Sequence, residues 1–154
     1  MNFELENKVA LVTGGSKNIG KEIALSLATE KVNIAFTYNS SENEAKETEA
    51  EIKKMGVNVK AYKLDISKFD ETQNVLNMID KDFGNIDILI NNAGYTKIKK
   101  FVETNLDDWN KQIDTSLKGA IHCCYLVSKK MIDNQNGRII NIVGDSSRVG
   151  EANL

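Results

Sequence analysis

The sequence predicts an α/β domain in which a parallel sheet carries helices on both faces. Short apolar segments alternate with longer segments whose apolar residues recur at helical spacing, in the order β-α-β-α-β-α-β-α-β. The apolar segments show little polar alternation, which is typical of parallel strands buried on both faces. A glycine-rich turn joins the first strand to the first helix, and such a turn presents backbone N–H groups to an anion. These observations predict three layers, α/β/α, with a nucleotide-binding edge.

The first half of the chain supplies three predicted strands and two predicted helices. The strands are expected at 9–12, 32–38 and 57–64. The first helix is predicted from the spacing of its apolar residues, which are Ile19, Ile23, Ala24, Leu27 and Ala28. Ser41 and Glu44 have the spacing of a capping box, which predicts the start of a charged helix that Gly56 ends.

The second half supplies two further strands and two further helices. The strands are expected at 86–90 and 138–143. Ser67 and Asp70 predict a capped helix, and its inner face carries Val75, Leu76, Ile79 and Phe83. Asn105, with two aspartates in the first turn after it, predicts the start of a long helix. One stripe of that helix carries Ile113, Leu117, Ile121, Cys124, Tyr125 and Ser128.

Composition narrows the classes of protein that the chain can belong to. Its 154 residues are 41% hydrophobic and 27% charged, which suits one globular domain. The net charge of −2 argues against a nucleic-acid partner, and no apolar run approaches the roughly 20 residues that cross a bilayer. The first residues lack the pattern of a signal peptide, so we expect a cytoplasmic protein with no membrane partner.

Two adjacent cysteines and one histidine provide no metal site in this interpretation. Cys123 and Cys124 are neighbours within a helical pattern, where successive side chains point about 100° apart, so a bridge between them is not expected. His122 is the single histidine of the chain. We expect all three residues to be packing or surface residues, with no metal ligand among them.

The glycine turn allows two interpretations. Residues 15–21 nearly match the phosphate loop of nucleoside triphosphatases, in which a Ser or Thr follows the lysine and binds magnesium. Here that position holds Glu22, whose carboxylate would repel a triphosphate. The alternative is a dinucleotide-binding turn, Thr13-Gly14-x-x-x-Asn18-x-Gly20, and this interpretation is favoured. A flavodoxin-like or response-regulator domain is disfavoured, because no acidic cluster follows the first strand.

Three motifs in a fixed order then indicate a family. The glycine turn is followed by Asn91-Asn92-Ala93-Gly94 after the fourth strand and by Gly137-Arg-Ile-Ile-Asn-Ile at the fifth. This order resembles the short-chain dehydrogenase/reductase family, in particular its 3-oxoacyl-acyl-carrier-protein reductases. The resemblance implies a Rossmann-type, doubly wound parallel sheet and one NAD(P)-binding domain over residues 1–154. It also implies a small-molecule carbonyl substrate and a homo-oligomer. Asn18 departs from the family's glycine, and asparagine is the next residue best able to adopt positive φ.

The resemblance assigns the cofactor-binding residues. Gly14, Ser16, Lys17, Ile19 and Gly20 match the side of the pyrophosphate and 2′-phosphate; Asp65 matches the adenine position; Asn91, Ala93 and Gly94 match the ribose segment. An NAD site usually has an acid after the second strand, but 36–40 contains none. Because Lys17 adds a cation where the family's reductases meet a 2′-phosphate, we expect NADP(H), and NAD(H) stays an alternative.

At the positions of the family's catalytic residues, in contrast to its cofactor-binding positions, this sequence does not match the family. The proton-relay Asn is replaced by Ser116, and the position of the catalytic Ser is held by Gly144. Ser146 lies two residues further on, which moves a hydroxyl by roughly 6–7 Å along an extended chain. The family's Tyr-x-x-x-Lys pair belongs on a helix beyond the fifth strand, and none of the four tyrosines occupies that position. We therefore assign no catalytic residue and expect this chain to be inactive.

The resemblance to the family also predicts an incomplete domain. This domain is truncated after the fifth strand and lacks the catalytic and substrate-binding part. The fifth strand is then an exposed edge, and the stripe on the long helix has no cover. Family-type oligomers are doubtful for such a chain. The alternative is a non-catalytic nucleotide-binding module or pseudoenzyme, which Ser116 and Gly144 favour because truncation does not explain substitutions at retained positions.

Overall fold

The computed structural model describes residues 3–144, which form a five-stranded sheet in the order β3-β2-β1-β4-β5. All four neighbouring pairs are parallel. The strands are β1 (Val9–Val12), β2 (Asn33–Tyr38), β3 (Val59–Lys63), β4 (Ile88–Asn91) and β5 (Arg138–Asn141). The chain moves outward from β1 to β3 and then crosses back to β4, so the doubly wound sheet predicted from the sequence is confirmed.

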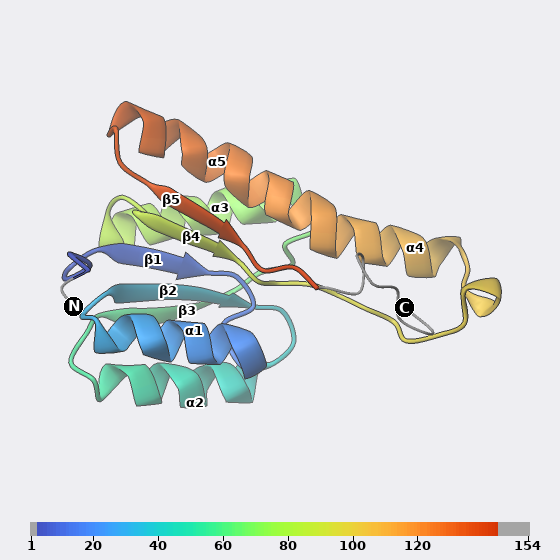
Figure 1. Ribbon diagram of the computed structural model, residues 1–154, viewed down its shortest axis with the longest axis horizontal. Coiled ribbons are helices and arrows are strands. Elements are labelled where there is room, and N and C mark those ends of the chain that lie inside the picture. The colour runs from blue at the N-terminus through green and yellow to red at the C-terminus, as the bar shows by residue number, and fades with distance from the viewer. Residues whose placement is uncertain (1–2, 145–154) are drawn as a thin grey trace.

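Helices cover both faces of the sheet, as predicted (Figure 1). One face carries α1 (Asn18–Thr29) and α2 (Glu42–Lys53), and the other carries α3 (Phe69–Phe83) and α5 (Gly119–Asp133). The segment before α5 consists of the 3₁₀ turn η1 (Phe101–Glu103), α4 (Leu106–Gln112) and the π-helical segment η2 (Ile113–Lys118). In Figure 1 α4 and η1 extend beyond the sheet as an arm. No helix within residues 3–144 is long and apolar enough to cross a membrane.

Each face of the sheet has its own apolar core. Ala10 and Val12 of β1 contribute to the core under α1 and α2, whereas Leu11 contributes to the core under α3 and α5. All of β1 and β4 is buried, because successive side chains of each strand enter opposite cores. This explains why the strands carry apolar residues without polar alternation.

Helix starts were predicted correctly at two of three positions, Ser41 before α2 and Asn105 before α4. The side chain of Asn105 accepts the N–H of Asp108 at 3.0 Å, and the reciprocal bond from Asn105 N to the Asp108 carboxylate completes a capping box. The side-chain cap bonds predicted at Ser41 and Ser67 do not form. Ser41 precedes α2 but makes no side-chain cap bond. Ser67 instead donates its hydroxyl to Asp65 at 2.6 Å, and α3 begins two residues later.

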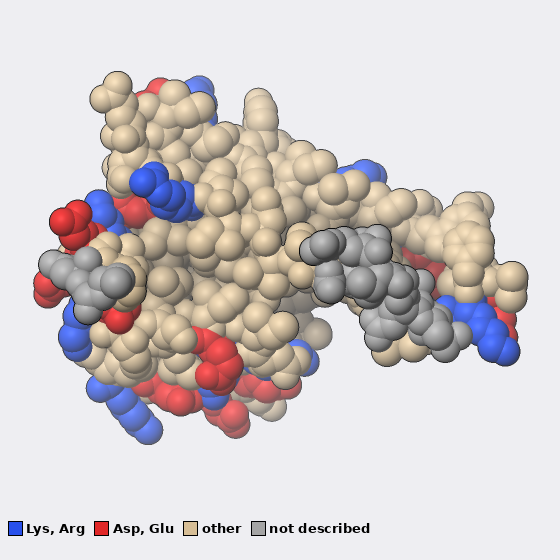
Figure 2. Space-filling model, in the orientation of Figure 1, with Lys and Arg blue, Asp and Glu red and all other residues tan. Residues whose placement is uncertain are grey.

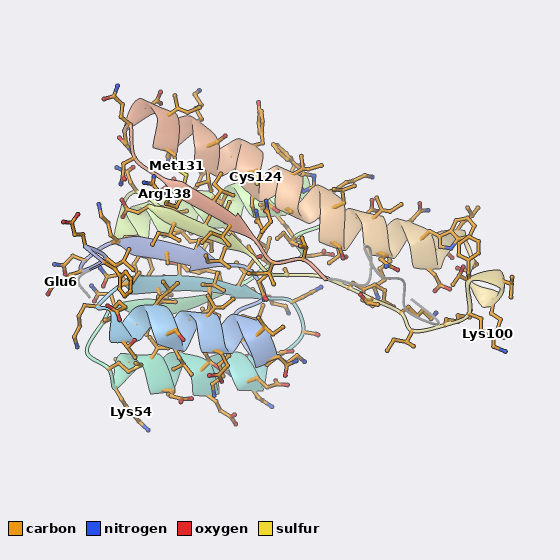
Figure 3. All side chains as sticks on the ribbon, viewed as in Figure 1. Glu6, Lys54, Lys100, Cys124, Met131 and Arg138 are labelled. Carbon is orange, nitrogen blue, oxygen red and sulfur yellow. The ribbon has the colours of Figure 1, made fainter. Side chains whose placement is uncertain are left out.

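The predicted long helix is present as one helical run over 106–133, of which the middle part, η2, is π-helical. The π-helical segment separates α4 from α5, and α5 packs on the sheet through Cys123, Val127 and Met131. Figure 3 labels Met131 on α5 together with Arg138, where β5 begins. Of the stripe residues, Cys124 packs against this core, whereas four are exposed: Ile113, Leu117, Ile121 and Tyr125. The stripe therefore lacks a cover among the described residues, as expected from the sequence.

The strand β5 is the exposed edge that the sequence predicts. All four of its residues are exposed, and Ile140 keeps 48% of its surface. Figure 2 shows that the molecular surface around β5 and α5 carries few charges in this view, whereas both signs gather over α1 and α2. No other described strand pairs with its outer edge, and an apolar strand edge of this kind favours association with other chains.

Candidate functional site

A cleft of about 560 Å³ opens at the carboxyl ends of β1, β2 and β4. The strand order reverses between β1 and β4, and crevices at such reversal points are the usual ligand sites of open α/β sheets. Five segments line the cleft, one after each of β1, β2, β3 and β4 and one from the α4–η2 helix. The site is therefore built from segments that are far apart in the sequence.

The turn after β1 holds its shape through backbone conformation and two hydrogen bonds to β2. Gly14 has φ of +65° and Asn18 has φ of +50°, so asparagine does adopt the conformation that the sequence analysis expected of it. The Gly14 N–H donates to the Thr37 hydroxyl at 3.2 Å, and the Gly15 N–H donates to the Thr37 carbonyl at 3.0 Å. These bonds fix the turn beside the carboxyl end of β2.

Gly20 allows helix α1 to approach the turn closely. A Cβ atom at this position would overlap with the Gly14 carbonyl oxygen and lie 2.5 Å from Nδ2 of Asn92. Such distances leave no room for a side chain, and neither atom is the free end of a flexible chain. Glycine is therefore required here for packing between α1, β1 and β4, which brings the N-terminus of α1 to the cleft.

Asn92 is the residue that joins β1 to β4 at the cleft, and the sequence analysis did not select it as a site residue. Its amide donates to the carbonyls of Thr13 (3.0 Å) and Gly14 (3.1 Å). The Thr13 hydroxyl accepts the N–H groups of Asn92 (2.9 Å) and Ala93 (3.0 Å). The motif Asn91-Asn92 was a signal, but the sequence does not say which of the two amides reaches the glycine turn.

Eight of the nine residues assigned to cofactor binding line this cleft: Gly14, Ser16, Lys17, Ile19, Gly20, Asp65, Ala93 and Gly94. Ile19 is 62% exposed, so it belongs to the cleft wall and not to the apolar face of α1 with which the sequence grouped it. Ser16 is buried, and its carbonyl accepts the Thr48 hydroxyl of α2 at 2.9 Å. The carboxylate of Asp65 is oriented by the N–H and hydroxyl of Ser67.

Two lysines contribute positive charge to the cleft lining. Lys17 lies 3.9 Å from a carboxylate oxygen of Glu44, and both side chains are about half exposed. Lys111 of α4 lies over the ring of Tyr95, with its Nζ atom 4.4 Å from the ring centre. Glu44 was not considered as a site residue from the sequence, because it lies six residues beyond the end of β2.

Asn91, the ninth assigned residue, faces a second cavity of about 950 Å³. Its amide donates to Oδ1 of Asn141 at 2.9 Å and lies 3.2 Å from Sγ of Cys124 (labelled in Figure 3). Its side-chain oxygen, Oδ1, is buried and has no hydrogen-bond partner among the described residues. The two cavities share the segment 92–94, so a ligand in the first would border the second.

The second cavity contains both substituted family positions that the structure describes. Ser116 lies in the π-helical segment, where its hydroxyl accepts the Tyr95 N–H (3.0 Å) and donates to the Tyr95 carbonyl (3.2 Å). Ser116 thus holds the segment after β4 in place. Gly144 lines the same cavity and brings no hydroxyl to it. Ser146 lies outside the described residues.

The spacing Tyr-x-x-x-Lys occurs twice before the fifth strand, and neither instance forms a phenol–ammonium pair in the described structure. Lys99, four residues after Tyr95, lies 3.4 Å from the carboxylate of Asp108. Tyr125 borders the second cavity, whereas Lys129 borders a separate cavity between α3 and α5. Among the described residues, neither instance therefore brings its tyrosine and its lysine together.

The cysteines and the histidine behave as packing residues. Cys123 is fully buried, and burial raises the pKa of its thiol to about 12, so it stays protonated at neutral pH. His122 places Nδ1 3.1 Å from the Ile66 carbonyl. Within residues 3–144 no group of three or more His, Cys, Asp or Glu side chains could hold a metal ion.

The comparisons with known proteins agree with this fold. The model of the family described as short chain dehydrogenase matches residues 8–154, so the chain belongs to that family. The chain is 40% identical over 150 residues to the 3-oxoacyl-[acyl-carrier-protein] reductase FabG of Staphylococcus epidermidis RP62A, covering 96% of this chain and 62% of that protein. It is 35% identical to an acetoacetyl-CoA reductase of Shinella zoogloeoides, covering 96% and 60%.

Two solved structures show the same fold. A short-chain alcohol dehydrogenase from Sinorhizobium meliloti 1021 superimposes with a TM-score of 0.93 at 32% identity, over 99% of this chain and 60% of that one. An NAD⁺-bound xylitol dehydrogenase superimposes with a TM-score of 0.91 at 32% identity, over 97% and 58%. The chain thus spans about three fifths of the length of the relatives that it matches.

Proposed function

We propose that the chain binds a nicotinamide dinucleotide in the first cleft, and that it is the cofactor-binding portion of a short-chain oxidoreductase. The observation that carries this proposal is the close approach of α1 to β1 and β4 at Gly20. This approach brings the N-terminus of a 12-residue helix to the point where the strand order reverses. A pyrophosphate fits such a place, because unpaired N–H groups and the helix dipole favour an anion there.

The remaining contacts follow from the arrangement of the cleft. The turn from Gly14 to Gly20 would hold the pyrophosphate, and Asp65 would hold the adenine from beyond β3. The segment 92–94 would border the ribose on the nicotinamide side. The nicotinamide, which supplies hydride transfer when the cofactor is bound, would then face the second cavity. Asn91, whose side-chain Oδ1 has no hydrogen-bond partner among the described residues, lines that cavity.

The cofactor that we propose is NADP(H). No acid stands at the carboxyl end of β2 to accept a ribose 2′-hydroxyl, and Lys17 adds a cation to the adjoining wall of the cleft. The NAD⁺-bound xylitol dehydrogenase shows that this fold also accommodates NAD⁺. Equilibrium titration of the purified chain with NADPH and NADH decides between the two, and we expect saturable micromolar binding with NADPH bound more tightly.

The parent reaction that we propose is reversible reduction of a small carbonyl compound of the 3-oxoacyl type, in a soluble cytoplasmic enzyme. The curated relatives are named as reductases of such substrates. As this chain stands, we propose that it does not turn over, since Ser116 and Gly144 replace the relay and carbonyl-orienting groups. NADPH consumption with a 3-oxoacyl thioester should equal the rate without protein. Measurable turnover would contradict this.

A non-catalytic nucleotide-binding module is the second candidate. The specific observation in its favour is that Ser116 has a structural role, because its hydroxyl makes both hydrogen bonds to Tyr95. The DNA downstream of codon 154 separates the two candidates. A sequence encoding Tyr-x-x-x-Lys there, in frame or after a frameshift, supports a portion of a reductase. Its absence supports the module.

A further inference from the structure

The ammonium group of Lys17, which lines the cleft, also lies close to a carboxylate, that of Glu44. Lys17 is the residue that precedes α1, and Glu44 lies in the first turn of α2. Their charged atoms are 3.9 Å apart across the gap between the two helices. The residues that lead into α2, from 38 to 41, line the cleft. Glu44 therefore places a negative charge beside the wall where the sequence alone indicated only a positive one.

Among the described lysines near this wall, Lys17 is the one that lines the cleft, whereas Lys63, whose charge acts on Glu42, does not line it. Lys111 is the other lysine that lines the cleft, but it comes from α4 and lies over Tyr95. Lys46 is paired with Glu42 at 2.8 Å within α2. The electrostatic preference of this wall for a phosphate over a hydroxyl thus depends on Lys17 and is opposed by Glu44.

We infer that Glu44 is a specificity-determining residue that limits the preference for a 2′-phosphorylated dinucleotide. This inference rests on the proposed function. A 2′-phosphate near Lys17 would experience the repulsion of Glu44 and would have to compete with it for the ammonium group. A 2′-hydroxyl has no charge and is little affected. The carboxylate reaches the wall from helix α2, which is why the acid-free end of β2 did not reveal it.

A second ion pair between the same helices provides the matched control. Lys21 of α1 and Glu51 of α2 are 2.7 Å apart, and neither residue lines the cleft. Glu51 raises the pKa of the Lys21 ammonium through a side-chain hydrogen bond. Glu51→Gln changes the net charge by the same amount as Glu44→Gln and also breaks an α1–α2 ion pair. Unlike the pair of Lys17 and Glu44, the pair of Lys21 and Glu51 contains no residue that lines the cleft.

The test is the ratio of the dissociation constants for NADPH and NADH, measured by equilibrium titration at low ionic strength. Glu44→Gln should tighten NADPH binding by about three- to tenfold and change NADH binding by less than about twofold, since only the phosphate is charged. Glu51→Gln should leave the ratio unchanged. Adding Lys17→Met to Glu44→Gln should remove the gain. The gain should also shrink in about 0.5 M salt, where exposed charges are screened.

Two results would overturn the inference while leaving the proposed function intact. One is an unchanged ratio in Glu44→Gln, and the other is an equal shift in Glu51→Gln, which would indicate a general charge effect. Thermal unfolding of each variant shows that the fold is retained. Absence of saturable binding of either nucleotide, to the parent chain and to every variant, would instead overturn the proposed function and this inference with it.

Discussion

At the scale of single residues, the cleft depends on the absence of a methyl group at Gly20. Gly20→Ala would place that methyl against the Gly14 carbonyl and the Asn92 amide, and the Asn92 amide is held by two hydrogen bonds. We expect a loss of about 1–3 kcal/mol in the free energy of unfolding, typical of overpacking, together with weaker NADPH binding. Urea denaturation and nucleotide titration measure the two effects.

Gly94→Ala is the control for this substitution. Gly94 also lines the cleft, but a Cβ there would meet only the Ser116 hydroxyl oxygen, at an ordinary 3.5 Å. The variant should unfold within about 0.5 kcal/mol of the parent chain. Equal destabilisation by the two substitutions would contradict the special role of Gly20.

The hydrogen-bond partner of a single polar side chain is hard to predict from sequence when several polar groups lie nearby. The cap at Asn105 was predictable because its side-chain oxygen accepts the N–H of Asp108 three residues on, a purely local bond. The cap at Ser67 failed because the Asp65 carboxylate, two residues away, takes its hydroxyl. Asn91 and Asn92 look equivalent in sequence, yet successive side chains at a strand end point to opposite sides. Only Asn92 reaches the glycine turn.

At the scale of elements, the start of α4 should contribute to stability in a pH-dependent manner. The hydrogen bond from Lys97, with further contributions from Asn105 and Lys99, lowers the pKa of the Asp108 carboxyl. A carboxyl whose pKa is lowered by folding stabilises the fold above its unfolded value, about 3.9, and this contribution is lost as the pH falls through its folded value. Asp108→Asn should therefore destabilise the chain at pH 7 and make progressively less difference below about pH 4.

Urea denaturation of both proteins between pH 7 and pH 3 measures this effect. Asp107→Asn is the control, since Asp107 lies in the same first turn and has no ion pair or side-chain hydrogen bond in the described structure. A difference between parent and Asp108→Asn that grows toward acid pH would show that the sign is wrong.

The two faces of α5 should respond differently to truncation of a side chain. Val127 is 4% exposed in the core under α5, whereas Ile121 is 54% exposed on the uncovered stripe. Val127→Ala should cost about 1.5–3 kcal/mol in unfolding free energy through lost burial and a residual cavity. Ile121→Ala, which removes a larger side chain, should stay within about 0.5 kcal/mol. Equal losses in urea denaturation would mean that the stripe is covered in solution.

At the scale of the whole molecule, the fold could be predicted because its signals are local and repeated. Five apolar segments and the helical spacing between them define the sheet and its layers without any long-range information. The choice between two apolar faces of α5 could not be made this way. The helix carries apolar residues on both faces, and the packing of α5 on α3 and β4 decides which face is buried.

The site is likewise only partly predictable at this scale. Motifs identified eight residues that the fold brings to one cleft, because each motif follows a strand at the same edge of the sheet. Glu44 escaped notice because it approaches Lys17 from a helix and not from a strand end. A charged residue that approaches a site from a neighbouring helix does not lie at a fixed number of residues from any sequence motif.

The central claim is that a nicotinamide dinucleotide binds at the carboxyl edge of β1 and β4. Titration of ¹⁵N-labelled chain with NADPH, followed by amide chemical shifts, tests it most directly. We predict that the largest saturable shifts occur in the turn from Gly14 to Gly20 and in the segment 92–94, with little change in the amides of η1. Saturable shifts confined to other parts of the molecule, or no saturable shift at all, would contradict the account.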